Sequence, residues 1–392
     1  MAWYSILPPE LTHLESWVAR IFFFLGLITI GPWAFLVLLD ATIWIYRLIL
    51  WEVPYIGGRA RGRQRPRAPS LNERPGGQRR AFGLRGVETD AGDNEGDLIP
   101  MDKTYKSRVA LRKSVLDQHH DIVVAINNDE TPEEDSRIRP AISELYNFML
   151  GTYLPTRYPS MFRLYAESSF FQNLVTGATW PTTLSPTTPT IQALEILSQT
   201  VDEDFLILLP EISPDSEEQP RYVLQAYATC FPAGFNTREK LGLRLADIHS
   251  PVPRYQERIG RSMDKFFARI EVGKFVKRLN WSITIGTDLF AAFGGTHAMS
   301  GKKEEAIELG KLNVDQTVLR CERQTLHRLP VSKALVFIVH TYVYPIRQIK
   351  DEGSGEDLAN AVDGLKRGNV PEIHTYKRGD VWGEALKDFL RA

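Results

Sequence analysis

A long apolar run lies near the start of the chain. Residues 21–39 contain no charged side chain, and the apolar character continues to Trp51 with Asp40 and Arg47 as its charged exceptions. A helix rises about 1.5 Å per residue, so about 20 apolar residues can cross a hydrocarbon layer about 30 Å thick. We therefore predict a transmembrane anchor over residues 21–51, preceded by a short N-terminal segment over residues 1–20.

This run has two other interpretations, a cleaved signal peptide and a buried core helix. A signal peptide has a basic start and a small-residue cleavage site, whereas the residues before Ile21 are acidic and carry no such site. A core helix would not be followed directly by an arginine-rich segment, as this run is. The pattern therefore favours a single membrane pass.

Between residue 101 and the C-terminus, stretches with helical spacing are interleaved with stretches of strand spacing. Helices are predicted to open at Pro140 and at Pro253, the first ending at Gly151 and the second burying Ile259 in its apolar stripe. Strands are predicted over residues 204–210, 221–231, 274–286, 317–326 and 334–344. The last of these is almost wholly apolar, as a central strand would be. The hairpin connections indicate an α+β domain, an antiparallel sheet with surrounding helices.

The overall composition is that of a globular protein. The chain has 392 residues, of which 43% are hydrophobic and 24% charged, and a net charge of −1. These values exclude a wholly disordered chain and a polytopic transporter. Its two cysteines, Cys230 and Cys321, cannot form a disulfide framework, a zinc ribbon or an iron–sulfur site, so we expect a reducing compartment.

The charge is unevenly distributed along the chain. Residues 56–86 carry nine arginines against the single carboxylate of Glu73. We predict that residues 52–100 form a disordered Arg/Gly/Pro-rich linker, because they hold few large apolar side chains. Nucleic-acid binding is one interpretation of the arginines. Next to an apolar span we instead expect attraction to anionic lipid, at about 1 kcal/mol per basic residue, and no nucleic-acid partner. The positive-inside rule then places residues 101–392 in the cytosol.

Motifs for phosphate loops, serine-hydrolase elbows, HExxH zinc sites and CxxC pairs are absent from the sequence, so histidines are the main ligand candidates. His249 lies in a Pro-braced loop that suits an axial metal ligand, with a plain helix-terminal histidine as the alternative. His327 ends a predicted strand, and His340 in the central strand is more often a core histidine. His297 is expected on a mobile loop. The others are expected outside the folded core or in a C-terminal loop: His13, His119, His120 and His374.

Polar side chains also recur within two predicted strands. Arg320, Glu322 and Gln324 share one face of residues 317–326, and Arg278 is a similar case in residues 274–286. Arg320, Glu322 and Arg323 form either a structural ion-pair network or a site where an arginine fork binds an anionic group. Cys230 invites a thiolate-ligand interpretation, but a small buried cysteine is far commoner.

Several segments, in this order, resemble the family related to the α subunit of haem-dependent oxidative N-demethylase, in its fungal branch: ELYNFMLGTYLPTRYPSMF, DEDFLILLP, CFPAGFNTREKLGLRLADIHSPVPRY, SMDKFFARIEVGKFVKRLNW and LRCERQTLHRLPVSKALVFIVHTYVYP. The resemblance begins near Leu145, runs to the C-terminus and covers roughly two thirds of the chain. The predicted anchor and linker lie outside it.

The resemblance implies a PAS-like α+β domain that binds haem b. In the characterised bacterial members the haem activates O2 and oxidises an N-methyl group of a small amine, releasing formaldehyde, with electrons from a separate flavin and iron–sulfur reductase. For this chain it implies a haem-dependent monooxygenase that needs an external reductase. A non-catalytic haem-binding PAS-type sensor and a membrane-tethered scaffold are the alternatives, because a fold does not fix an activity.

Residue by residue, the resemblance implies His249 as the axial ligand, with His327 and His340 as the next candidates. Glu322 is implied to deliver protons or to fix an arginine. The implied groups for propionate contacts or for orienting the pocket are the arginines Arg278, Arg320 and Arg323. The implied walls of the haem site are aromatic: Tyr255, Trp281, Phe231, Phe235 and Tyr342.

Overall fold

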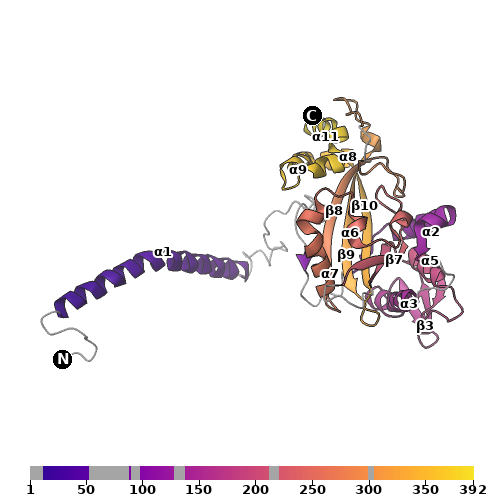
Figure 1. Ribbon diagram of the computed structural model, residues 1–392, viewed down its shortest axis with the longest axis horizontal. Helices are drawn as coiled ribbons and strands as arrows, with labels where there is room; N and C mark the ends of the chain where they lie inside the picture. The colour runs from indigo at the N-terminus through magenta and orange to yellow at the C-terminus, as the bar shows by residue number, and fades with distance from the viewer. Residues whose placement is uncertain (1–11, 53–87, 90–97, 128–136, 212–219, 299–303) are drawn as a thin grey trace. The chain divides into compact units, whose positions relative to one another are not determined.

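The computed structural model describes residues 12–52, 88–89, 98–127, 137–211, 220–298 and 304–392 (Figure 1). They fall into two units, residues 1–70 and 71–392, each described by itself. The predicted segment over residues 1–20 and the predicted linker over residues 52–100 lie largely outside the described residues.

The first unit contains the helix α1 (Thr12–Glu52). Within it, Trp17–Leu39 is apolar and long enough to cross a membrane, and none of this stretch is buried inside protein. It is the one such span among the described residues. A signal sequence has the same length and composition, so the membrane anchor stays a prediction.

The second unit is built on a seven-stranded sheet with the strand order β1-β8-β9-β10-β6-β7-β2. Every neighbouring pair is antiparallel. The strands are β1 (Glu88–Thr89), β2 (Val124–Ile126), β6 (Asp204–Pro210), β7 (Tyr222–Ala228), β8 (Phe275–Ile285), β9 (Thr317–Arg328) and β10 (Leu335–Pro345). The five longer strands match those predicted from the sequence, and the apolar β10 lies at the centre as expected.

A small second sheet and several helices complete this unit. The second sheet, which the sequence did not predict, contains β3 (Phe162–Tyr165), β4 (Phe170–Asn173) and β5 (Thr179–Pro181). The α-helices are α2 (Tyr105–Val123), α3 (Ile138–Phe148), α4 (Leu154–Arg157), α5 (Thr190–Thr200), α6 (Leu245–Ile248), α7 (Arg261–Arg269), α8 (Ile346–Asp351), α9 (Gly355–Arg367), α10 (Glu372–Tyr376) and α11 (Gly379–Arg391). The π and 3-10 turns are η3 (Met149–Tyr153), η4 (Thr237–Lys240), η5 (Gln256–Gly260) and η6 (Val314–Gln316).

Helices pack against both faces of the seven-stranded sheet. On one face, α2, α3 and α5 cover Ile207 and Ile338, and α8, α9 and α11 cover Leu319 at the other end of the strands. We call this the α2/α5 face. On the opposite face, the α6/α7 face, α6 and α7 pack on Leu208 and Leu326. Figure 1 shows α6 and α7 lying over the long strands and α8, α9 and α11 gathered at one end of them.

Two helix predictions were wrong, each because of a π turn. Gly151 does not end the first helix, because the chain continues from α3 through η3 into α4. Ile259 is 44% exposed instead of buried, and Phe267 takes its place in the core. The rest of the predicted stripe is confirmed, since Ile270 is buried and Met263 and Phe266 pack on the same cluster. The wide turn η5 shifts the helical phase ahead of α7, so Ile259 falls outside the stripe.

The N-terminal edge of the folded body also differs from the prediction. His119 and His120 belong to α2, where His119 stacks on Phe290 with ring centroids 4.4 Å apart. Leu98 and Ile99 are buried as well, so packed structure reaches upstream of residue 101.

A buried ion pair joins α2 to the sheet. Arg112 Nη1 lies 2.9 Å from Asp204 Oδ1, and both side chains are almost inaccessible. The same carboxylate accepts hydrogen bonds from the backbone N–H groups of Cys230 (2.8 Å) and Phe231 (3.0 Å). Arg320 in β9 donates to the carbonyls of Phe231 and Pro232. The turn that follows β7 is therefore held by side chains from α2, β6 and β9.

Replacing Asp204 by Asn should destabilise the fold by about 3–5 kcal/mol, because Arg112 would keep a buried charge without its counter-ion. Urea unfolding of the full chain in detergent, followed by tryptophan fluorescence, measures this. The double variant Arg112→Met/Asp204→Leu removes both charges and should lose less stability than the two single variants combined. Additive losses would contradict the coupling of this pair.

Candidate functional site

A row of polar side chains lies on the α6/α7 face of β8 and β9. The strand register pairs its members as follows: Arg278 with Gln324, Asn280 with Glu322, and Ser282 with Arg320. This confirms the prediction that Arg320, Glu322 and Gln324 share one face. Polar positions in the middle of a long antiparallel pair are unusual unless their partners or a ligand satisfy them.

Apolar positions beside this row are only partly covered. Leu206, Phe337 and Val339 lie on the same face of β6 and β10 and keep accessible surface, although they belong to central strands. On the opposite face of the same strands, Ile207 and Ile338 are fully buried. The α6/α7 face therefore combines an incompletely covered apolar floor with an adjoining polar row.

His249 follows α6 directly, and its Nδ1 lies 2.8 Å from the carbonyl oxygen of Leu245. A carbonyl can only accept, so Nδ1 carries the proton and Nε2 keeps its lone pair. Nε2 has no hydrogen-bond partner within the described ranges. Burial, with the nearby charges of Arg278 and Lys240, lowers the pKa of His249. A neutral imidazole with a fixed tautomer and a free Nε2 is the form that binds a metal.

Tyr255 fixes the plane of this imidazole. The two rings are stacked with centroids 4.7 Å apart and an interplanar angle of 11°. Tyr255 is 5% exposed, and its hydroxyl is buried without a hydrogen-bond partner in the part of the chain that the structure describes. Burial raises the pKa of this phenol to about 12. A neutral, unsatisfied hydroxyl beside His249 is a group that a bound molecule could satisfy.

Two cations beside His249 form no direct ion pair among the described residues, although the charge of Glu322 raises the pKa of both. Arg278 donates through Nε to Gln324 (2.5 Å), and neither its Nη atoms nor the ammonium of Lys240 forms an ion pair among the described residues. Lys240 Nζ instead lies 3.5 Å from the ring centroid of Phe235. Burial lowers the pKa of Arg278 and lowers that of Lys240 to about 8. Arg278 is exposed and Lys240 is half-buried, so both cations are accessible to an anionic ligand.

Glu322 is the negative centre of this region. It is 8% exposed, and its Oε2 accepts hydrogen bonds from Asn280 (3.2 Å) and Gln324 (2.8 Å). Its charge raises the pKa of surrounding cations, among them Lys377, without overcoming the effect of burial. The charge of this one carboxylate therefore stabilises the charged form of several neighbouring cations.

Sequence reasoning missed part of this cluster. Lys377 donates through Nζ to Asn280 Oδ1 (3.0 Å) and to the carbonyl of Trp281, and burial lowers its pKa to about 8. His297, which the sequence marked as a histidine candidate on a loop, also lies near this cluster: it stacks on Tyr376, and burial lowers its pKa to about 4. Lys240 ends η4 and Lys377 follows α10, and folding alone brings them near Glu322, so no spacing in the sequence marked these two lysines.

Three residues predicted for the site have other surroundings. Arg320 is 1% exposed and uses its Nη atoms on backbone carbonyls, including that of Leu289 (3.0 Å). Arg323 lies on the α2/α5 face, where it donates to the carbonyl of Leu98 (3.1 Å). Trp281 also faces that side, in the core with α9 and α11. The geometry gives these three no contact with His249.

Burial raises the pKa of Cys230 to about 12. The residue is therefore a thiol, which gives no support to a thiolate ligand.

His340 is held between carboxylates on the α2/α5 face. Its Nδ1 lies 3.1 Å from Glu203 Oε1 and its Nε2 lies 3.3 Å from Asp102 Oδ2. Burial opposes its charge, but the surrounding carboxylates raise the pKa of His340 to about 9. A protonated imidazole with both nitrogens occupied has no lone pair for iron.

His327 is the strongest competitor to His249. It is 8% exposed on the α2/α5 face, and both ring nitrogens are buried without a partner among the described residues. Burial alone lowers its pKa to about 4, with no neighbouring charge contributing. The ring is therefore neutral, and both of its nitrogens are free among the described residues.

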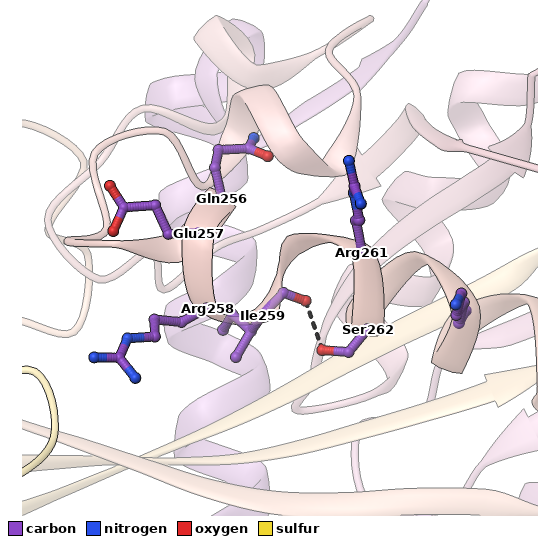
Figure 2. Close-up of a pocket in the computed structure, with 7 residues that line it drawn as sticks. Gln256, Glu257, Arg258, Ile259, Arg261 and Ser262 are labelled. Atoms are coloured by element: carbon purple, nitrogen blue, oxygen red, sulfur yellow. Dashed lines mark hydrogen bonds between the residues drawn. The ribbon is translucent and has the colours of Figure 1, made fainter.

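An open hollow elsewhere on the surface lies against η5 and the start of α7. Figure 2 shows its lining residues, which are mostly polar or charged: Gln256, Glu257, Arg258, Ile259, Arg261, Ser262 and Lys265. This composition does not suit a flat apolar cofactor. No group of three or more His, Cys, Asp or Glu side chains that could hold a metal ion occurs among the described residues. A haem iron needs only one such donor.

The chain is thus an α+β protein whose α6/α7 face offers one free ring nitrogen, two cations without a direct ion pair and a partly uncovered apolar floor. These are groups that could hold an anionic cofactor. Residues 92–387 match the family model described as haem-dependent oxidative N-demethylase, alpha subunit-like. The chain belongs to this family, as the resemblance of its segments predicted. The family name indicates haem dependence and an N-demethylase-like oxidoreductase function. The donors around His249 fit a haem.

His340 should make stability depend on pH. Its folded-state pKa, about 9, lies above that of an unfolded histidine, so its contribution is complete below about pH 6.5 and disappears as the pH rises to about 9. The difference in unfolding free energy between the native chain and His340→Gln should therefore shrink by up to about 3 kcal/mol over this range. Urea unfolding at pH 6, 7.5 and 9 measures it. A difference that stayed constant with pH would show that His340 is not charged in the fold.

Proposed function

We propose that this chain is a membrane-anchored haem-binding oxidoreductase that carries out O2-dependent oxidative N-demethylation, or a related monooxygenation, of a small amine. Family membership supports the haem and the reaction class. The observation that carries the site assignment is the His249 imidazole, whose Nδ1 is bonded to a carbonyl while Nε2 stays free beside unpaired cations.

In this proposal His249 would hold the haem iron through Nε2. Arg278 and Lys240 hold the propionate carboxylates of a haem b, because they are the cations near His249 without an ion pair within the described residues. Leu206 and Val339 form the floor of the haem site. A ligand held between an antiparallel sheet and short helices is typical of a PAS-like domain, and we propose that architecture here.

The bound haem would supply the oxidising power for the reaction with O2. The chain's own groups would hold the substrate and move protons. Glu322 uses Oε2 for both of its hydrogen bonds, which leaves Oε1 for the N–H of a protonated amine. Lys377 Nζ is bonded to Asn280, which is bonded in turn to Glu322. A pKa of about 8 lets this ammonium exchange a proton near neutral pH.

Electrons would come from a separate protein. The sequence contains no nicotinamide, flavin or iron–sulfur binding motif, so an enzyme of this kind needs an external flavin and iron–sulfur reductase.

The full chain, purified in detergent and supplied with haem, should show a Soret absorption band that His249→Ala abolishes or shifts. His327→Ala is the matched control, because it also removes a buried neutral histidine but on the opposite face of the sheet, and it should leave the band unchanged. A band lost in His327→Ala and kept in His249→Ala would contradict the ligand assignment. A native chain without any Soret band would favour the scaffold alternative.

Turnover separates the enzyme from the sensor in the same preparation. Reductant-dependent release of formaldehyde from a panel of small N-methylamines is the expected result. An intact Soret band with no formaldehyde from any amine would favour a non-catalytic haem sensor.

The membrane anchor has its own test. The full chain should stay in alkaline-washed membranes with its N-terminus uncleaved, as measured by mass spectrometry. Phe23→Arg/Leu27→Arg in the apolar stretch of α1 should release it, since each arginine at the centre of a span costs about 2.5–3.5 kcal/mol. Phe23→Ala/Leu27→Ala is the matched control and should stay bound. A processed N-terminus would identify a signal sequence instead.

A further inference from the structure

Asn280 in β8 lies between two side chains of opposite charge. Lys377 Nζ donates to Asn280 Oδ1 (3.0 Å), and Asn280 Nδ2 donates to Glu322 Oε2 (3.2 Å). Lys377 and Glu322 form no direct ion pair within the described residues, although the charge of Glu322 raises the pKa of Lys377. An ammonium and a carboxylate are therefore held one side-chain amide apart, beside the polar row of the α6/α7 face.

Each of these two charged groups can form a further hydrogen bond. Glu322 uses Oε2 for both of its hydrogen bonds, which leaves Oε1. Lys377 Nζ donates to Asn280 and to the carbonyl of Trp281, and an ammonium has three N–H groups. Glu322 is 8% exposed and Lys377 is 9% exposed, so both keep some accessible surface. A ligand could therefore bond to both groups while Asn280 stays in place.

The amide of Asn280 indicates which polarity such a ligand needs. An ammonium can only donate and a carboxylate can only accept, so the amide presents its oxygen to Lys377 and its N–H to Glu322. A ligand lying beside this amide would need an anionic group facing Lys377 and a cationic N–H group facing Glu322. The zwitterion of an α-amino acid has this polarity, with its ammonium and its carboxylate attached to the same carbon atom.

The balance of charge also favours a ligand without net charge. The charge of Glu322 raises the pKa of three cations, Arg278, Lys240 and Lys377. In the proposed function the two propionates balance Arg278 and Lys240, which leaves Lys377 and Glu322 as one charge of each sign. A protonated alkylamine would add a cation without a counter-ion to this pair, whereas a zwitterion adds one charge of each sign.

We propose that the substrate is an N-methyl α-amino acid, whose amine bonds to Glu322 Oε1 and whose carboxylate bonds to Lys377 Nζ. This inference rests on the proposed function and specifies its substrate class. In the reaction one C–H bond of the methyl group is replaced by C–OH, and cleavage of the bond between that carbon and nitrogen releases formaldehyde and the demethylated amino acid. One oxygen atom of O2 enters formaldehyde, and two electrons from the external reductase with two protons reduce the other to water.

The first test compares two secondary amines on the haem-loaded full chain in detergent. N-methylglycine has a carboxylate, and N-methylethylamine is of similar size but lacks one. N-methylglycine should bind at least about tenfold more tightly at pH 7, as measured by isothermal titration calorimetry, because only its carboxylate can bond to Lys377. Equal affinities, or tighter binding of N-methylethylamine, would overturn the proposal, and this comparison needs no variant.

Lys377→Met tests the residue assignment. It should weaken binding of N-methylglycine at least about tenfold and binding of N-methylethylamine by less than about twofold. Lys350→Met is the matched control, because Lys350 Nζ also donates to a backbone carbonyl, that of Phe389 (2.8 Å), and lies 4.6 Å from an aromatic ring centroid, as Lys377 lies 5.4 Å from that of Trp281. It should change neither affinity by more than about twofold. Equal losses for the two amines in Lys377→Met would show a purely structural role and overturn the assignment.

Formaldehyde release separates a failure of this inference from a failure of the proposed function. With the Soret band intact, the expected result is a higher kcat/KM for N-methylglycine than for N-methylethylamine. Formaldehyde from N-methylethylamine and none from N-methylglycine would overturn this inference and leave the proposed function standing. No formaldehyde from either amine, with N-methylglycine still bound preferentially, would contradict the proposed function and identify a binding site for the zwitterion.

Discussion

The ion pair between Arg112 and Asp204 is the interaction on which the candidate site depends. Taking two charges out of water is costly unless every remaining polar group is also bonded, and here it is. Arg112 also donates to the carbonyls of Ser198 (2.8 Å) and Glu203 (2.5 Å), while Asp204 accepts from two backbone N–H groups. With Arg320 on the other side, this fixes the turn after β7. The chain leads from that turn through η4 to Lys240 and on to His249. Both residues therefore lie on a segment whose start is held by Asp204 and Arg320.

The two faces of the sheet differ in their balance of cations and carboxylates. On the α2/α5 face, His340 lies between the carboxylates of Glu203 and Asp102 and is protonated well above neutral pH. On the α6/α7 face the cations outnumber the carboxylates, and burial lowers the pKa of Lys240 and Lys377 to about 8. Cations that form no direct ion pair and whose charge burial disfavours are suited to binding an anion. This imbalance, more than any single residue, favours the α6/α7 face for a haem with two propionates.

Much of the fold could be predicted from the sequence, because strand periodicity is local. The alternation of polar and apolar residues located the five longer strands. The same alternation places Arg323 and Glu322 on opposite faces of the sheet, and likewise Trp281 and Arg278, as the register confirms. The π turns could not be predicted, because they break the period on which helix prediction depends. Lys240 and Lys377 could not be predicted either, since they meet Glu322 only through tertiary structure. The Pro-braced loop was informative for His249, but the hydrogen bond that frees Nε2 is visible only in three dimensions.

The central claim is that His249 holds the cofactor on the α6/α7 face. A crystal structure of the haem-loaded protein tests this most directly. It should show iron bound by Nε2 of His249, the propionates against Arg278 and Lys240, and the ring of Tyr255 still stacked on the ligand. Iron bound by His327 on the α2/α5 face, or a haem with no contact to either cation, would contradict it.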